Sequence, residues 1–194
     1  MLRGDNNLTD RDYIEIIKTR LSEKRFIHSL EVAKAARRIA PKYGSDENKA
    51  YTAGILHDIL KDTPREEMLA LAAEFDIIFS DVEKAEQKLW HAIIGAVYAE
   101  KKLFVGDRDI ILAIRYHTTA RAGMSPLEKT LYIADFISAD RDYPGVEEMR
   151  EAAKGEPHDA MTTALKFTVS DIIEKGSALH PDTVYAYNEL VLGR

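Results

Sequence analysis

The apolar run Ala53-Gly54-Ile55-Leu56 ends in the polar pair His57-Asp58. Further potential metal ligands occur on both sides of this pair: His28, His91, His117 and Asp135. When the neighbouring segments are read as helices, these polar side chains fall on apolar stripes. Buried imidazoles and carboxylates are tolerated only when they are hydrogen-bonded, paired or bound to a metal. The sequence therefore predicts one shared metal centre and, as the leading interpretation, a metal-dependent hydrolase.

Helical spacing explains how ligands that are far apart in the sequence can meet. Residues three and four apart share one face of a helix, so His28 aligns with Val32 and Asp135 aligns with Leu131. Ligands from several helices can then converge in the core of a bundle, where helical proteins often build metal sites. A single histidine on an apolar face is more often a hydrogen-bonded core residue, so the prediction depends on the joint pattern. The second such pair, His158-Asp159, follows Glu156-Pro157 and is interpreted as a surface feature at a helix start.

Helical periodicity runs through the whole chain, and convincing strand alternation is absent. We expect helices over residues 10–21, 26–41, 46–59, 65–75, 90–102, 108–118, 126–138, 158–175 and 181–192. Residues 75–79 could form a short strand, but no partner strand is apparent nearby. The predicted fold class is all-α, with one domain over residues 1–194 and a flexible extension over residues 1–8.

Composition narrows the class of protein. The chain has 194 residues, of which 45% are hydrophobic and 31% are charged, as in an ordinary soluble globular protein. A formal net charge of −6 offers no electrostatic footprint for nucleic acid or an anionic membrane. Because the chain has no cysteine, a metal site must use nitrogen and oxygen ligands. Neither a signal peptide nor a membrane-spanning stretch is visible, so a cytoplasmic location is expected.

The order His28, His57-Asp58, Asp135 resembles the HD-domain superfamily of metal-dependent phosphohydrolases. A closer resemblance, to the YqeK family, covers nearly the whole chain. It rests on several segments in the same order, namely residues 28–33, 53–58 with Lys61-Asp62, 114–119, 132–135, 141–146 and 180–183. The resemblance implies a helical bundle of the HD-domain type with a metal site in its core. It also implies symmetrical hydrolysis of diadenosine tetraphosphate into two ADP molecules.

The same resemblance implies a set of metal ligands. They are His28, His57, Asp58 and Asp135. Iron is the first choice for the divalent metal, and manganese, cobalt and zinc suit the same ligands. We expect a metal-bound hydroxide to attack a central phosphorus. The expected catalytic residues are Asp58, Lys61, His91 and His117. In an alternative arrangement, His91 and His117 bind a second ion that Asp58 bridges to the first.

Substrate binding is expected to involve a wider group. Its members are Arg25, Lys61, Asp62, Thr63, Pro64, His91, His117, Thr118, Arg141, Ala178, Leu179, His180, Pro181, Asp182 and Thr183. Lys61 follows Asp58 by three residues, which places it near the metal. Without the resemblance, Arg141 would be interpreted as a loop arginine that pairs with Asp140 or Asp142. Residues 176–183 have the local pattern of a helix end, a loop and a new helix, so their nucleotide role is implied by the resemblance alone.

Other functions remain open at this point. One is an HD phosphohydrolase acting on a mononucleotide, a triphosphate or a cyclic dinucleotide. Another is a non-catalytic regulatory module that binds a metal and a nucleotide. The least specific is a helical protein whose histidines are packed in its core. The expected partner is a small-molecule dinucleoside polyphosphate or nucleoside diphosphate, with no nucleic acid and no membrane, and the sequence leaves a homodimer open.

Overall fold

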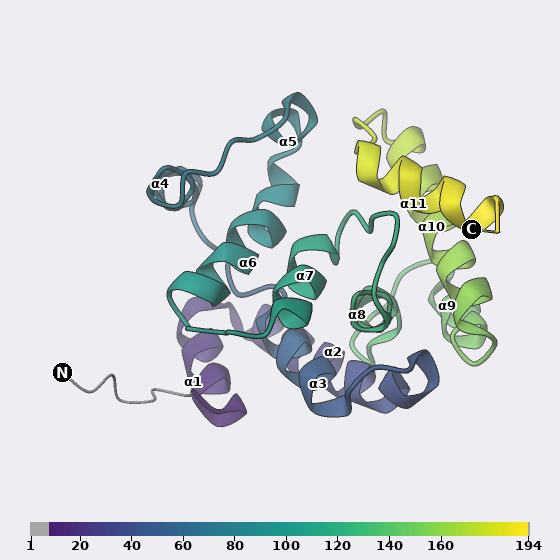
Figure 1. Cartoon of the computed structure of the whole chain (residues 1–194), viewed down its shortest axis with the longest axis horizontal. Coiled ribbons are helices and arrows are strands. Elements are labelled where there is room, and N and C mark those ends of the chain that lie inside the picture. The colour runs from purple at the N-terminus through teal and green to yellow at the C-terminus, as the bar shows by residue number, and fades with distance from the viewer. Residues whose placement is uncertain (1–7, 194) are drawn as a thin grey trace.

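The computed structural model describes residues 8–193, and every regular element in this range is a helix, which confirms the all-α prediction (Figure 1). The elements are α1 (Asp10–Arg20), α2 (Glu23–Tyr43), α3 (Glu47–Leu56), α4 (Arg65–Glu74), α5 (Asp81–Ala85), the single 3₁₀ turn η1 (Gln87–Leu89), α6 (Trp90–Lys101), α7 (Arg108–Tyr116), α8 (Pro126–Ile137), α9 (Val146–Ala152), α10 (Pro157–Glu174) and α11 (Pro181–Val191). Apart from Leu8, the predicted flexible extension lies outside the described residues.

The centre of the bundle is formed by α2, α3, α7 and α8. Helix α2 packs along α3 and α8, and α7 packs against α3, α6 and α8. In Figure 1, α4 to α6 lie on one side of this centre and α9 to α11 lie on the other. Each central helix buries an apolar stripe, and Leu56, Ile114 and Leu131 are completely inaccessible to solvent. The stripes predicted from helical spacing therefore form a shared core.

A close approach between α2 and α3 depends on Gly54. A Cβ atom at this position would lie only 2.4 Å from Cα of Ala33, which is backbone and cannot move away. The glycine thus allows the two helix backbones to touch. This contact brings His28 on α2 beside His57 at the end of α3, with ring centroids 5.3 Å apart.

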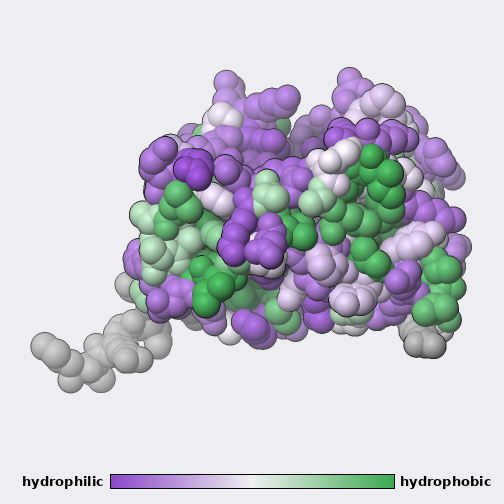
Figure 2. Space-filling view, turned by 90° about the horizontal axis from the view of Figure 1, so that it is seen from above, coloured by the Kyte–Doolittle hydropathy of each residue, from purple (hydrophilic) through white to green (hydrophobic). Residues whose placement is uncertain are grey.

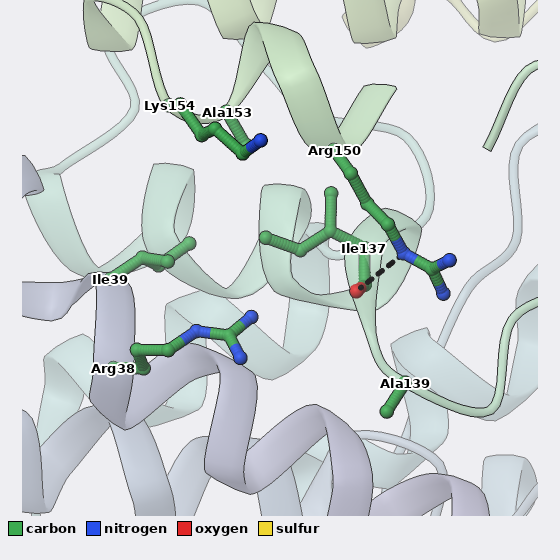
Figure 3. Close-up of a pocket in the computed structure, with 7 residues that line it drawn as sticks. All are labelled: Arg38, Ile39, Ile137, Ala139, Arg150, Ala153 and Lys154. Carbon is green, nitrogen blue, oxygen red and sulfur yellow. Dashed lines mark hydrogen bonds between the residues drawn. The ribbon is translucent and has the colours of Figure 1, made fainter. Parts of the chain in front are cut away.

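The turn after α8 is fixed by Arg150 on α9. Its guanidinium donates hydrogen bonds to the carbonyl oxygens of Ser138 and Arg141, both at 2.9 Å, and to that of Ile137 at 3.4 Å. Arg150 and Ile137 line a pocket of about 450 Å³ between α2 and the α8–α9 segment (Figure 3). The bonds cap the C-terminal carbonyls of α8. They hold the turn that carries Asp140 and Arg141.

The short strand considered possible at residues 75–79 does not form. Asp76 adopts the left-handed conformation (φ 56°) directly after α4. The N–H of Asp76 donates to Ala73 O, and the N–H of Ile77 donates to Ala72 O. These bonds form a Schellman motif, which satisfies the last carbonyls of the helix. The apolar segment is therefore a helix end followed by a loop.

Several helix ends differ from the prediction by a few residues, and two of them concern the site. Helix α3 ends at Leu56 rather than Ile59, and α7 ends at Tyr116, so His57 and His117 are C-cap residues. The short helices α5 and α9 were not predicted.

None of the described helices combines the length and apolar character needed to cross a membrane. On the face shown in Figure 2, hydrophilic residues separate several small hydrophobic groups.

Candidate metal centre and active site

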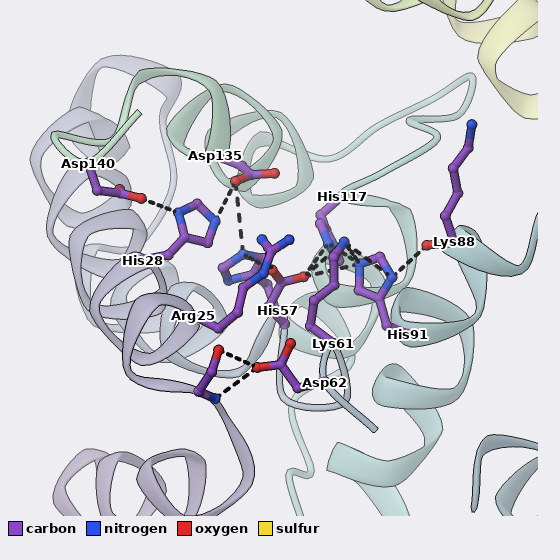
Figure 4. A network of polar contacts seen from close by, with 12 residues as sticks. Arg25, His28, His57, Lys61, Asp62, Lys88, His91, His117, Asp135 and Asp140 are labelled. Atoms are coloured by element: carbon purple, nitrogen blue, oxygen red, sulfur yellow. Dashed lines mark hydrogen bonds and ion pairs between the residues drawn. The ribbon is translucent and has the colours of Figure 1, made fainter. Parts of the chain in front are cut away.

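Four histidines form a continuous row in the core of the bundle. His57 lies between His28 and His117, with centroid distances of 5.3 and 5.0 Å, and His91 lies 5.1 Å beyond His117 (Figure 4). All four are at least 97% buried. Each comes from a different part of the chain: α2, the end of α3, α6 and the end of α7. The convergence predicted from the sequence is therefore present.

Helix termini orient two of these rings. The Nδ1 atoms of His57 and His117 lie 2.7 Å from the carbonyl oxygens of Gly54 and Ile114, three residues earlier in each case. A carbonyl oxygen can only accept, so each Nδ1 carries the proton and donates. The same bonds satisfy carbonyls at the ends of α3 and α7. Each Nε2 atom is left with a lone pair.

The other two rings are oriented in the same way. Nδ1 of His91 donates to Lys88 O at 2.7 Å, and Nδ1 of His28 donates to the carboxylate of Asp140 at 2.8 Å. Such outer partners fix the tautomer and the direction of a metal-ligating imidazole. Nε2 is thus the atom that each of the four rings can offer to a metal ion. Asp140 was missed as a functional residue, because its partner is 112 positions away in the sequence.

Asp58 joins the two halves of the row. Its Oδ1 lies 3.1 Å from His91 Nε2 and 3.6 Å from His117 Nε2, and its Oδ2 lies 3.7 Å from His57 Nε2. The carboxylate is almost completely buried. Burial opposes its ionisation, but the neighbouring histidines, His57 first, and Lys61 hold the pKa of Asp58 well below its ordinary value. The site therefore contains a buried anion.

Two of the imidazoles are neutral at physiological pH. Burial lowers the pKa of His57 to about 3 and that of His91 to about 4. Neutral imidazole is the form that binds a metal. Burial also opposes protonation of His28, but its contacts with Asp135 and Asp140 raise its pKa. The site thus combines a buried carboxylate with two neutral imidazoles.

The arrangement fits a metal ion. Nε2 of His57 is buried and has no hydrogen-bond partner among the described residues. A buried polar atom without a partner is costly unless an ion or ligand binds it. Two groups of potential ligand atoms, each mutually within 4.8 Å, are His28–His57–Asp58 and Asp58–His91–His117. With nitrogen and oxygen donors only, these clusters imply a divalent metal site.

Asp135, the fourth predicted ligand, lies at the rim of the first cluster. Its Oδ1 is 2.9 Å from His28 Nε2 and 4.0 Å from His57 Nε2. It also forms an ion pair with Arg141. The carboxylate partner of Arg141 is therefore Asp135, and not Asp140 or Asp142 as the bare sequence suggested.

Three cations surround the clusters. Lys61 Nζ lies 3.7 Å from Asp58 Oδ1 and 3.0 Å from His91 Nε2. Arg25 Nη1 lies 3.4 Å from Asp58 Oδ2, and Arg141 lies beside Asp135. Burial lowers the pKa of Lys61 despite the nearby carboxylates. The two arginines retain partial solvent access, so a substrate anion can reach them.

Asp62, Thr63 and Pro64, which follow Lys61 in the chain, lie in different surroundings. Asp62 accepts hydrogen bonds from the N–H and hydroxyl of Ser22, at 2.8 and 2.7 Å, and so anchors the start of α2. Thr63 lines a cavity together with Lys61, and Pro64 precedes α4. The hydroxyl of Thr118, beside His117, is buried without a hydrogen-bond partner among the described residues. The substrate-binding roles of these residues stay predictions.

The segment 178–183 contacts residues that are close in the chain to His91 and His117. Ala178 N–H donates to Glu86 at 3.0 Å, and the hydroxyl of Thr183 donates to Thr119 O at 2.8 Å. His180 is the N-cap of α11 and accepts the N–H of Asp182 at 3.1 Å. Leu179 lies in the loop before this N-cap, and Pro181 is the first residue of α11. Thr119, whose carbonyl oxygen accepts this hydrogen bond, is two residues after His117 in the chain.

Glu83 on α5 was missed by the sequence analysis and ties this segment to α7. Its Oε1 accepts from Arg115 at 2.8 Å and lies 3.5 Å from His180 Nε2. Its Oε2 accepts the N–H of Ser80 at 2.8 Å. Burial opposes ionisation of this carboxyl, but Ser80 and Arg115 hold the pKa of Glu83 below its ordinary value.

We expect Glu83→Gln to lower the free energy of unfolding by about 1–2 kcal/mol at pH 7, because it removes a buried charge partner of Arg115. A depressed carboxyl pKa stabilises the fold above the unfolded value of about 4.3, and this stabilisation is lost as the pH falls. The melting temperatures of variant and parent should therefore converge in acid. Thermal melts at pH 7 and pH 3, with the exposed Glu66→Gln as control, measure this. A gap that persists at pH 3 contradicts it.

The fold and site define a class: helical, metal-dependent hydrolases built on a buried His-Asp pair. The HD domain family matches residues 25–140. Symmetrical bis(5'-nucleosyl)-tetraphosphatases from Bacillus subtilis and Halalkalibacterium halodurans are 38% and 36% identical to the chain, over 91% and 92% of it and 95% of each relative. A crystal structure from Clostridium acetobutylicum is described as that of a predicted HD superfamily hydrolase involved in NAD metabolism. It matches 96% of this chain and 99% of its own chain, with a TM-score of 0.91 and 34% sequence identity. The chain belongs to the HD-domain family and, within it, to the YqeK family.

Proposed function

We propose that this chain is a metal-dependent hydrolase that cleaves diadenosine tetraphosphate symmetrically into two ADP molecules. The observation that carries the proposal is the pair of His/Asp clusters that share Asp58 and are flanked by Lys61, Arg25 and Arg141. Relatives that match over nine-tenths of the chain have this activity in their names. A cytoplasmic location and a homodimer stay predictions.

The proposed metal ligands are His28, His57, Asp58 and Asp135, with iron as the first choice and manganese, cobalt or zinc as alternatives. When bound, a divalent ion supplies a water of lowered pKa and neutralises phosphoryl oxygens. The chain's own contribution is to orient the ligands through Asp140 and the helix-end carbonyls. His57 Nε2, which is buried and has no hydrogen-bond partner within residues 8–193, supports this assignment.

The cations bind and position the phosphate chain in this proposal. Lys61, the nearest to Asp58 and His91, stabilises negative charge that develops at the central phosphates. Arg25 and Arg141 hold the chain from the side of His28. Asp58 acts as a ligand and as a proton acceptor for the attacking water.

His91 and His117 are proposed to hold a second ion together with Asp58. Their Nδ1 protons are engaged by carbonyl oxygens, so their Nε2 atoms are acceptors. Contact with a phosphate oxygen, itself an acceptor, would require a further proton on Nε2. A cation takes the lone pair as it stands. This observation favours the two-ion arrangement over direct substrate contact.

The test of the function is product analysis. Purified protein is incubated with diadenosine tetraphosphate and manganese, cobalt or anaerobic ferrous iron, and the nucleotides are separated chromatographically. ADP as the only product supports the proposal. ATP plus AMP would overturn the position of attack. Absence of turnover by metal-loaded protein would favour the regulatory module.

Metal binding should also be visible without catalysis. We expect a divalent ion at about 100 times its dissociation constant to stabilise the fold by about 2.7 kcal/mol, because only the folded chain assembles the ligands. For a chain of this size the melting temperature should rise by about 5–10 °C and fall again on chelation. Differential scanning fluorimetry with and without a chelator measures this. No shift in the presence of measured bound metal would contradict it.

A further inference from the structure

A cavity of about 290 Å³ opens beside the second cluster, between the start of α4 and the η1–α6 junction. Lys61 and His91, which belong to the proposed active site, form one wall. The rest of the lining includes Arg65, Lys88, Met68 and Trp90. The cavity is therefore continuous with the place where the phosphate chain would be cut. The expected substrate-binding residues include Lys61, Thr63 and His91 but not Arg65, Lys88, Met68 or Trp90.

The lining is strongly cationic. Lys61, Arg65 and Lys88 contribute three positive charges, and no aspartate or glutamate in the described part of the chain lines the cavity. Arg65 has no ion pair within residues 8–193, and its guanidinium lies 6.0 Å from the Trp90 ring. Lys88 extends away from the cluster and lies 3.1 Å from Glu86 (Figure 4). Cations that lack buried partners are available to an anionic ligand.

The cavity is separate from the segment 178–183. That segment is held by Glu83, Glu86 and Thr119 and does not line the cavity. Lys88 lies between the two, with Nζ 3.4 Å from the hydroxyl of Ser177. The cavity is thus a binding position separate from the segment 178–183, and it adjoins Lys61 and His91. A symmetrical dinucleotide has two identical halves, and each half needs its own binding position.

We propose that this cavity binds the second nucleoside diphosphate half of the substrate, with Arg65 and Lys88 on its outer phosphates. Met68 and Trp90 form an apolar floor for the ribose, and the volume suits a ribose diphosphate better than a whole nucleotide. The assignment rests on the proposed function. It makes Arg65 and Lys88 specificity-determining residues that select a dinucleoside polyphosphate over a mononucleotide.

The test uses the double variant Arg65→Gln/Lys88→Gln of the metal-loaded protein. Isothermal titration with ADP should detect two bound molecules per parent chain and one per variant chain. With diadenosine tetraphosphate as substrate, the variant loses two charge-assisted contacts. We expect this loss to raise KM by at least about tenfold and to change kcat little. The matched control, Arg11→Gln/Lys18→Gln, removes the same charge from the exposed face of α1 and should behave as the parent.

The outcomes separate this inference from the proposed function. Two ADP sites reduced to one in the double variant support the cavity assignment, even if the parent fails to hydrolyse the dinucleotide. A single ADP site in a parent that does produce ADP overturns the cavity assignment and leaves the function intact. An unchanged KM and stoichiometry in the folded double variant also overturn it. Melting temperatures confirm that each variant is folded.

Discussion

Asp58→Asn should reduce kcat/KM for diadenosine tetraphosphate by at least about a thousandfold. Asp58 is the residue that both ligand groups share, with Oδ1 facing His91 and His117 and Oδ2 facing His57. The amide keeps nearly the same shape but carries no charge, so it is a poor ligand and cannot accept the water proton. The substitution also removes the carboxylate partner of Lys61 and Arg25, so the melting temperature of the variant is measured to confirm that it is folded.

The control for this variant is already present in the chain. Asp159→Asn changes the second His-Asp pair, which is exposed at the start of α10, with 75% of the Asp159 side chain accessible. It should leave both turnover and metal content unchanged. Elemental analysis of the two proteins separates lost metal from lost chemistry. A folded Asp58→Asn protein that keeps its metal and more than about a tenth of its turnover would rule out the shared-ligand role.

The convergence of the proposed ligand residues was predictable because burial of a polar group leaves a local trace in the sequence. His28, His91 and Asp135 stand at positions where helical spacing demands an apolar residue, and a folded chain must compensate for each. The exposed pair His158-Asp159 lacks such a setting, and it lies on the surface as expected. What the pattern predicts is therefore that these side chains are buried and partnered. The resemblance, rather than the spacing, supplied their chemical roles.

The partners of these residues left no such trace. Asp140 orients His28, although the two residues are 112 positions apart in the sequence. Arg150 fixes the turn that carries Asp140 by donating hydrogen bonds to backbone carbonyl oxygens, which are present in any sequence. Hydrogen bonds of this kind depend on how the helices pack. The end of α3 differs from the prediction for a related reason. Ile59 and Leu60 are fully buried and continue the apolar pattern through a turn, so periodicity alone cannot detect that α3 ends at Leu56.

Gly54→Ala should destabilise the fold by about 3 kcal/mol or more, although alanine is the better helix former by about 1 kcal/mol. The new Cβ would lie 2.4 Å from Cα and 2.8 Å from N of Ala33, so α2 and α3 must move apart. Their separation would also pull His28 from His57. We therefore expect the melting temperature to fall by about 6–12 °C and metal affinity to fall with it.

Gly95→Ala on α6 is the matched control, because it is the same substitution in another buried helix. A Cβ at Gly95 would meet only the side-chain atom Cγ2 of Ile59, at 3.8 Å, which is ordinary contact. There the helix propensity of alanine should prevail and leave the melting temperature equal or higher. Calorimetry of both variants measures the difference. If Gly54→Ala is as stable as Gly95→Ala, then α2 and α3 are not in backbone contact at Gly54, and the metal clusters must be aligned by the α7 and α8 contacts alone.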